Sequence, residues 1–235
     1  MDMRPPDQFT PWIALLLVLV IPLLLLWFAR RTRQGHEYTL RPIRAYQALR
    51  GVLARATENG KRVHVTVGSA GIGGDQTMAV SAGLAVLRYL ADQGASMGVS
   101  PLVTVADPVA MMAAQDTLYR AFQQSGRAAK YRGTDVALIA PDPTAYAVGA
   151  QDMATDDEVS VNVMVGSFGQ EYLLLGEPGA YRGDLVQVAG SNRLSAQPFV
   201  VATADHALVG EEIFAASAYL GDRPTIPTAA LETLC

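Results

Sequence analysis

The pattern of apolar and polar positions divides this 235-residue chain into three regions. Residues 11–29 form an apolar run, residues 41–59 repeat apolar side chains at helical spacing, and from residue 60 short β-rich runs alternate with longer helical ones. Such alternation predicts a Rossmann-like α/β domain, a mostly parallel sheet with helices on both faces. We assign this domain to residues 60–222.

The alternation also gives the expected order of elements. We expect strands at residues 63–67, 102–105, 136–139, 159–165, 185–188 and 199–202. Helices are expected at residues 77–93, 108–124, 144–155 and 206–220, and the ambiguous segment 169–176 is interpreted as a helix. The remaining residues, 223–235, contain two prolines and no period, which is typical of a loosely held C-terminal tail.

The apolar run at residues 11–29 predicts a single transmembrane helix in a lipid bilayer. Nineteen residues form about 28 Å of helix, close to the hydrocarbon thickness of a membrane. Trp12 and Trp27, the only tryptophans, lie near its two ends, where indole rings prefer the membrane interface. Arginines occupy positions 30, 31 and 33, where a cleaved signal peptide would have small residues.

Charge is divided as unevenly as hydropathy. Residues 30–62 contain nine basic and two acidic side chains, whereas residues 63–235 carry a net charge of −10. The positive-inside rule then predicts a single-pass cell-membrane protein, with residues 1–10 outside and the main domain cytoplasmic. An acidic domain lacks the basic surface that nucleic acids require, and the single cysteine, Cys235, agrees with a reducing compartment.

A basic juxtamembrane linker and helix, residues 30–59, joins the anchor to the domain. Its helical part, residues 41–59, repeats apolar side chains on one face, and Asn59 with Gly60 ends it. The members of that face are Ile43, Tyr46, Leu49, Leu53 and Ala56.

Several aspartates stand where a strand is expected to hand over to a helix. In a doubly wound sheet these junctions share the carboxyl edge with the segments 68–75 and 166–169. A carboxylate at such a junction accepts backbone N–H bonds as a helix N-cap, and proline follows two of the aspartates. We therefore interpret them as caps: Asp75, Asp107, Asp142 and Asp205.

The segment Gly68–Asp75, GSAGIGGD, is a glycine-rich loop between a strand and a helix. Glycines let a backbone approach a phosphate, and the helix N-terminus favours an anion. However, Asp107 lies 39 residues after Gly68, whereas a dinucleotide fingerprint expects an acidic residue about 20 residues on, and no Lys-Ser/Thr pair completes a P-loop. A tight structural turn and an anion-binding loop both remain open.

No complete catalytic constellation is visible in the sequence. Ser167 lies in a second glycine turn without a nucleophile motif, and Asp205 with His206 can orient an imidazole or simply begin a helix. Three histidines provide no metal-ligand spacing. The candidate ligand-binding residues are those of the expected carboxyl edge: Gly68, Ser69, Gly71, Gly73, Gly74, Asp107, Ser167, Asp205 and His206.

Four sequence blocks carry a resemblance to a known family. They are TVADP at 104–108, NVMVG at 162–166, FGQEYLL at 168–174 and TADHALVGEE at 203–212. In this combination the chain resembles an uncharacterised family of bacterial membrane-anchored α/β proteins, a domain of unknown function. The resemblance implies a cytoplasmic α/β domain on a membrane anchor, and it transfers no activity or catalytic residue.

Two hypotheses follow. The first is a membrane-anchored, non-catalytic module that works in a membrane-associated assembly, with a membrane-protein partner or a second copy, and binds a small anionic ligand at its glycine edge. The alternative is a nucleotide-binding enzyme or sensor that uses residues 68–74 with Asp107, Ser167 and His206. No cofactor is evident under the first hypothesis, and a nucleotide belongs to the second.

Overall fold

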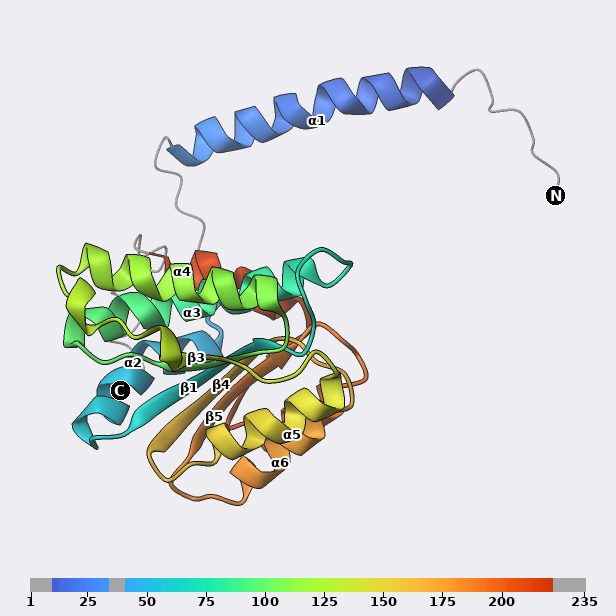
Figure 1. Ribbon diagram of the computed structural model, residues 1–235. Coiled ribbons are helices and arrows are strands. Elements are labelled where there is room, and N and C mark those ends of the chain that lie inside the picture. Colours follow the sequence, from blue (N-terminus) through green and yellow to red (C-terminus); the bar gives the residue numbers. More distant parts are fainter. Residues whose placement is uncertain (1–9, 34–40, 222–235) are drawn as a thin grey trace. The chain divides into compact units, whose positions relative to one another are not determined.

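The computed structural model describes residues 10–33 and 41–221, which belong to two compact units. Helix α1 (Thr10–Arg33) lies in one unit, and the sheet with the other helices forms the second, Arg41–Pro224 (Figure 1). The predictions for residues 1–9, the linker residues 34–40 and the tail after residue 221 fall outside the described residues.

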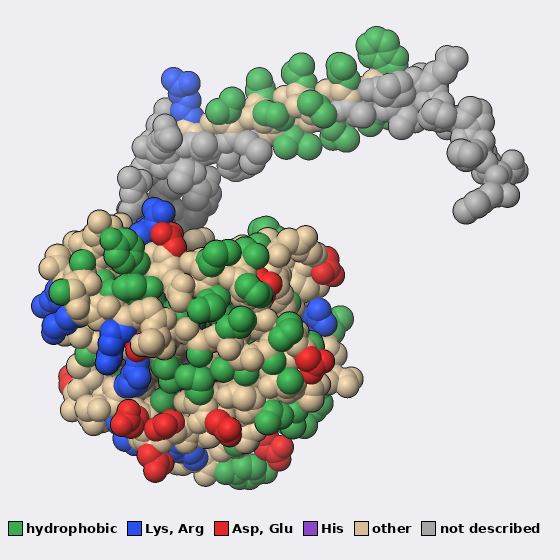
Figure 2. Space-filling model, in the orientation of Figure 1, with side chains coloured by type: hydrophobic (Ala, Val, Ile, Leu, Met, Phe, Trp, Pro, Cys, Tyr) green, Lys and Arg blue, Asp and Glu red, His purple; other side chains and the backbone are tan. Residues whose placement is uncertain are grey.

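Helix α1 is continuous through Pro22, and apolar side chains project from both edges of the helix in the view of Figure 2. Every large apolar side chain described between Trp12 and Trp27 is exposed, Val18 at 73% and Leu26 at 71%. Within the described parts of the chain, no helix combines the length and hydropathy needed to cross a membrane.

The second unit contains a six-stranded sheet in which every pairing is parallel. The strand order is β3-β2-β1-β4-β5-β6, so the direction of winding reverses between β1 and β4. The strands are β1 (Arg62–Gly68), β2 (Leu102–Val105), β3 (Val136–Leu138), β4 (Val159–Ser167), β5 (Val186–Ser191) and β6 (His206–Val209). The predicted α/β class with a mostly parallel sheet is confirmed.

Helices cover both faces of this sheet (Figure 1). One layer contains α2 (Arg44–Glu58), α3 (Thr77–Met97), α4 (Pro108–Gln124) and α8 (Ala216–Leu220). The other layer contains α5 (Pro143–Ala154), α6 (Tyr172–Ala180) and α7 (Gln197–Thr203). Three short 3-10 helices, Ala128–Lys130, Gly133–Asp135 and Gly210–Ala215, complete the described elements.

The predicted helix at residues 41–59 is confirmed as α2, and it packs on the sheet inside the second unit. All five side chains of its predicted apolar face are buried. Tyr46 donates a hydrogen bond to the backbone oxygen of Glu212 at 2.7 Å and stacks on Tyr219 with ring centroids 5.1 Å apart. The helix that follows the linker is therefore part of the domain core.

Two predictions near the C-terminus are wrong. Residues 199–202 form helix α7, not a strand, and residues 206–209 form strand β6 instead of beginning a long helix. Val200 is buried while its neighbour Val201 is 58% exposed. A four-residue apolar run fits one turn of helix as well as a short strand, and periodicity alone cannot decide between them.

A row of buried polar side chains crosses the sheet beneath α5, α6 and α7, and its hydrogen bonds have a defined direction. Gln187 Nε2 donates to the backbone oxygens of Gly176 and Thr203, each at 2.9 Å. Its Oε1 therefore faces Asn162 and accepts from Nδ2 at 3.3 Å. The orientation of both amide groups follows from these two backbone carbonyls.

The direction of these hydrogen bonds also determines which ring nitrogen of His64 carries the proton. Because Asn162 Oδ1 is left as an acceptor, His64 Nδ1 donates to it at 2.8 Å, and Nε2 accepts from Thr104 Oγ1 at 3.0 Å. Tyr146, from α5, continues the row to Thr104 and Thr66. Burial lowers the pKa of His64 to about 4, so the imidazole is neutral at physiological pH.

The first prediction concerns pH. Because the pKa of His64 is about 4 in the fold and near 6.5 in the unfolded chain, the unfolded state binds the proton first as pH falls. The stability that neutral His64 provides is complete above pH 6.5, and between pH 7.5 and 5 about 2 kcal/mol of it is lost. Urea unfolding of the full chain should show this loss, and His64→Gln should reduce the pH dependence. An unchanged pH dependence in the variant contradicts this assignment.

The second prediction concerns the contact of α3 with the sheet at Gly83. A Cβ there would lie 2.3 Å from the Val165 backbone oxygen, so Gly83→Ala should lower the free energy of unfolding by about 1–3 kcal/mol. Gly51, in α2, has open space around its Cβ position, and Gly51→Ala should stabilise by about 0.5–1 kcal/mol. Equal effects of the two variants in urea unfolding would count against this packing.

Candidate functional site

The candidate site lies where the carboxyl ends of β1 and β4 meet, at the reversal of strand order. Gly68 pairs with Ser167 there, and a Cβ on Gly68 would lie 2.7 Å from the Ser167 backbone nitrogen. A Cβ on Gly166 would lie 2.1 Å from the Val67 backbone oxygen. These two glycines therefore permit the close approach of the two strands, and Gly68 also has a positive φ of 112°.

Three backbone amides of the loop that follows β1 donate to acceptors of the protein itself. Ser69 N donates to the Ser167 backbone oxygen at 3.0 Å, and Gly73 N donates to Thr77 Oγ1 at 2.9 Å. Ile72 N lies 3.4 Å from Asp107 Oδ2, and Gly71 packs against the same carboxylate. A phosphate cradle needs free amides, so these three amides would have to leave their present acceptors to bind a phosphate.

Five polar side chains form what we term the switch-point cluster: Asp75, Gln76, Ser167, Asn192 and Arg193. Ser167 Oγ donates to Gln76 Oε1 at 2.9 Å and accepts from Arg193 Nε at 3.1 Å. Asn192 Nδ2 donates to the same Gln76 oxygen at 2.8 Å, and Gln76 Nε2 donates to Asp75 Oδ2 at 2.9 Å. The cluster joins the ends of β4 and β5 to the start of α3.

Glu171 adds a carboxylate beside this cluster. Its Oε1 accepts a hydrogen bond from the Gly169 backbone nitrogen at 2.7 Å and another from Ser69 Oγ. Both donors lie at the ends of the two central strands, so the side chain is oriented by the glycine turns themselves. A carboxylate of the protein thus already uses amide and hydroxyl donors that an anionic ligand would need.

An open hollow of about 550 Å³ adjoins the cluster. Its lining comes from the turn after β4, the first turns of α5 and α6, and the segment after β5: Thr144, Gly169, Gln170, Glu171, Leu173, Leu174, Arg193 and Ser195. Arg193 and Glu171 therefore face one space. The volume lies within the range of small-molecule sites, about 300–1,000 Å³.

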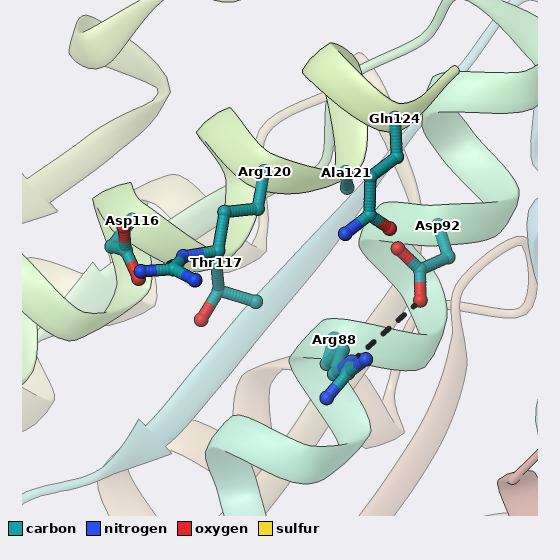
Figure 3. A pocket seen from close by; sticks show the side chains of 7 residues that line it. All are labelled: Arg88, Asp92, Asp116, Thr117, Arg120, Ala121 and Gln124. Carbon is teal, nitrogen blue, oxygen red and sulfur yellow. Dashed lines mark hydrogen bonds and ion pairs between the residues drawn. The ribbon is translucent and has the colours of Figure 1, made fainter.

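A second hollow, of about 290 Å³, lies between α3 and α4 (Figure 3). Arg88 lies 3.9 Å from Asp92, and Arg120 lies 2.7 Å from Asp116, each one turn along its own helix. Both arginines are therefore neutralised locally. The hollow involves the second halves of the two helices, which run back from the carboxyl edge of the sheet, so it is separate from the switch point.

The structure brings some predicted residues together and separates others. Gly68, Ser69 and Ser167 meet at the switch point, and Gly71 and Asp107 adjoin it through the loop. Gly73 and Gly74 border open space. The expectation that Asp205 and His206 share this edge is wrong.

Asp205 and His206 lie at the opposite edge of the sheet. His206 begins β6 and pairs with Val188, and Asp205 Oδ2 accepts from the Gln187 backbone nitrogen at 2.8 Å, so it does not cap a helix. The error follows from the interchange of strand and helix at residues 199–220, because a residue before a strand lies at the amino edge.

The capping interpretation holds for two of the remaining aspartates. Asp107 accepts from Ala110 N and Asp142 accepts from Ala145 N, each at 2.9 Å, and a proline follows each of them. Asp75 is a correction: α3 begins at Thr77 without a side-chain cap, and Asp75 bonds the Gln76 side chain instead.

Sequence reasoning missed four residues of the site: Gln76, Glu171, Asn192 and Arg193. For Asn192 and Arg193 the missed signal is their position, since polar side chains directly after a strand of a doubly wound sheet lie at its ligand-binding edge. Asn192 and Arg193 follow β5, and Arg193 is one of eight basic residues in the net-acidic region 63–235. Among the described residues, no group of three or more His, Cys, Asp or Glu side chains is arranged to hold a metal ion.

The fold and this site define a doubly wound α/β protein with a polar cluster at its switch point. The chain belongs to the family described as Domain of unknown function (DUF6754), whose sequence model matches residues 8–231. The matched range includes the residues of α1 as well as the sheet. Comparison with curated proteins and with solved structures found no match.

Proposed function

We propose that the chain is a membrane-tethered, non-catalytic α/β module that binds a small ligand with an anionic group at its switch point. The observation that carries this proposal is the state of Arg193. Its Nε is held by Ser167 Oγ, while its two terminal nitrogens have no partner among the described residues. A guanidinium fixed at one nitrogen presents a fork suited to a carboxylate or phosphate.

This proposal moves the ligand from the glycine loop to the side chains that surround it. The loop amides of Ser69, Ile72 and Gly73 are engaged by acceptors of the protein. Arg193 is exposed and lies beside the open hollow. The anionic group is therefore expected on the guanidinium, and the glycines serve the approach of the strands.

Binding is favoured over catalysis because Ser167 has no general base. Its hydroxyl donates to the neutral amide oxygen of Gln76. Of the two histidines within the described residues, His64 is buried with both ring nitrogens bonded, and His206 lies at the opposite edge of the sheet. A serine nucleophile needs an adjacent base that is itself oriented, and neither histidine can provide one.

The membrane tether is proposed for residues 11–29, with the N-terminus outside and the α/β unit in the cytoplasm. The support is the exposure of apolar side chains all around α1, since such a helix requires an apolar environment on every side. The sequence of residues 11–29, which contains no charged or polar side chain other than the two indole N–H groups, supports the same proposal. The basic residues that follow it support the orientation.

We further propose that the module works in a membrane-associated assembly, with another membrane protein or a second copy. Large apolar side chains are exposed near the carboxyl edge, Met78 at 69% in the first turn of α3 and Leu194 at 86% after β5. Met112, in the second turn of α4, is 62% exposed. Exposed apolar groups of this size are typical of contact surfaces when they gather in one region.

The strand order favours one alternative, a nucleotide-binding enzyme or sensor. Dinucleotide-binding proteins share the order 3-2-1-4-5-6 and bind their ligand at the same reversal point. In that case a nucleotide would lie across residues 68–74, and the loop amides would have to exchange their present acceptors for phosphate.

The third prediction tests the guanidinium. The thermal unfolding temperature of the full chain should rise when small carboxylates or phosphates are added. Arg193→Gln should abolish this rise, because the two terminal guanidinium nitrogens that contact the anion are lost. Arg120→Gln, a variant of a paired arginine in the second hollow, should retain it. Failure of every anion to stabilise the chain would contradict the proposed function, and stabilisation by nucleotides alone would favour the alternative.

The fourth prediction tests the orientation through Cys235, the single cysteine of the chain. A maleimide that cannot cross membranes should leave Cys235 unlabelled in intact cells and label it after permeabilisation, because the thiol is then on the cytoplasmic side. The matched control is Met3→Cys, which should be labelled in intact cells because residues 1–10 are expected outside. Labelling of Cys235 in intact cells would contradict the proposed topology.

A further inference from the structure

Two opposite charges line the hollow beside the switch point without pairing with each other. Arg193 and Glu171 both border this space of about 550 Å³, yet no ion pair within 4 Å joins them among the described residues. Each side chain is hydrogen-bonded to the protein through one atom, Arg193 through Nε and Glu171 through Oε1, and its other polar atoms have no partner among the described residues. This arrangement resembles two halves of a binding site for a molecule with both charges.

The positive half is held by two hydrogen bonds. Arg193 Nε donates to Ser167 Oγ at 3.1 Å, and its backbone nitrogen donates to Ser191 Oγ at 3.2 Å. Ser167 is completely buried and in turn donates to Gln76. The guanidinium plane is therefore oriented from its inner edge, and the two terminal nitrogens remain available for a bidentate contact with a carboxylate.

The negative half is held in the same manner. Glu171 Oε1 accepts from Gly169 N at 2.7 Å and from Ser69 Oγ, whereas Oε2 has no partner among the described residues. A carboxylate oriented by one oxygen offers the other to a cationic donor, and an ammonium group is such a donor.

The rest of the lining suits a small apolar group. Leu173 and Leu174, from the first turn of α6, border the same hollow, and Thr144 and Ser195 add hydroxyl groups at its sides. An anion without a cationic group leaves Glu171 Oε2 without a partner, and a simple cation would be repelled by Arg193. A molecule that carries one charge of each sign can satisfy both groups.

We propose that the ligand of this site is a small zwitterion of the α-amino acid class with an apolar side chain. Its carboxylate contacts the terminal nitrogens of Arg193, its ammonium contacts Glu171 Oε2, and its side chain lies against Leu173 and Leu174. This inference rests on the proposed function, because Arg193 is the anion-binding group in both, and it adds Glu171 as the residue that selects the ammonium.

The fifth prediction compares ligands and variants by equilibrium dialysis or calorimetry with the full chain. The twenty L-amino acids are screened first, and the tightest apolar one is compared with its N-acetyl form and its amide. Removing either charge should weaken binding about tenfold or more, since each charge-assisted hydrogen bond is lost. This comparison uses the unaltered chain and does not depend on how any variant folds.

Variants then separate the two charges. Glu171→Gln keeps an oxygen for Gly169 N and Ser69 Oγ, and it should weaken the free amino acid while leaving the N-acetyl form unchanged. Glu177→Gln, within α6 but outside the hollow, should change neither. If the N-acetyl form binds as tightly as the free amino acid and other carboxylates also bind, the zwitterion inference fails and the proposed function stands. If no anion of any kind binds, both fail.

Discussion

The close approach of β1 and β4 is the constraint on which the site depends. These two strands are neighbours in space but lie nearly a hundred residues apart in the chain, and glycine at 68 and 166 lets their carboxyl ends meet backbone to backbone. On one side of this contact the chain winds toward β3, and on the other toward β6. The loops at the reversal diverge, and polar groups from three of them then surround one point.

Hydrogen bonds convert this meeting of loops into an oriented site. Ser167, at the end of β4, both holds the Arg193 guanidinium and bonds the Gln76 amide, while Ser69 and Gly169 hold Glu171. Beneath α5, α6 and α7, the row of hydrogen-bonded side chains from Gln187 through Asn162 to His64 links the central strands inside the core. Charges at the surface are thus supported by a rigid central sheet, which limits the reorganisation that binding requires.

Much of this fold could be predicted from the sequence. Long periodic segments such as the helices at 77–97 and 108–124 are identified correctly because their apolar faces repeat many times. The segment at 199–209 is too short for periodicity to decide, and its misassignment moved Asp205 and His206 to the wrong edge of the sheet. Strand order, which places β4 beside β1, depends on long-range packing that local patterns do not contain.

The candidate site was predictable only in part for the same reason. Gly68, Ser69 and Ser167 lie at the carboxyl ends of strands, as expected, whereas Arg193 acquires its role only through a neighbour in another loop. The most direct test of the account is modification of the full chain with an arginine-specific dicarbonyl reagent, followed by peptide mass spectrometry. The account predicts that apolar L-amino acids protect Arg193 and leave the modification of Arg120 unchanged. Equal modification of Arg193 with and without every carboxylate and phosphate compound would contradict it.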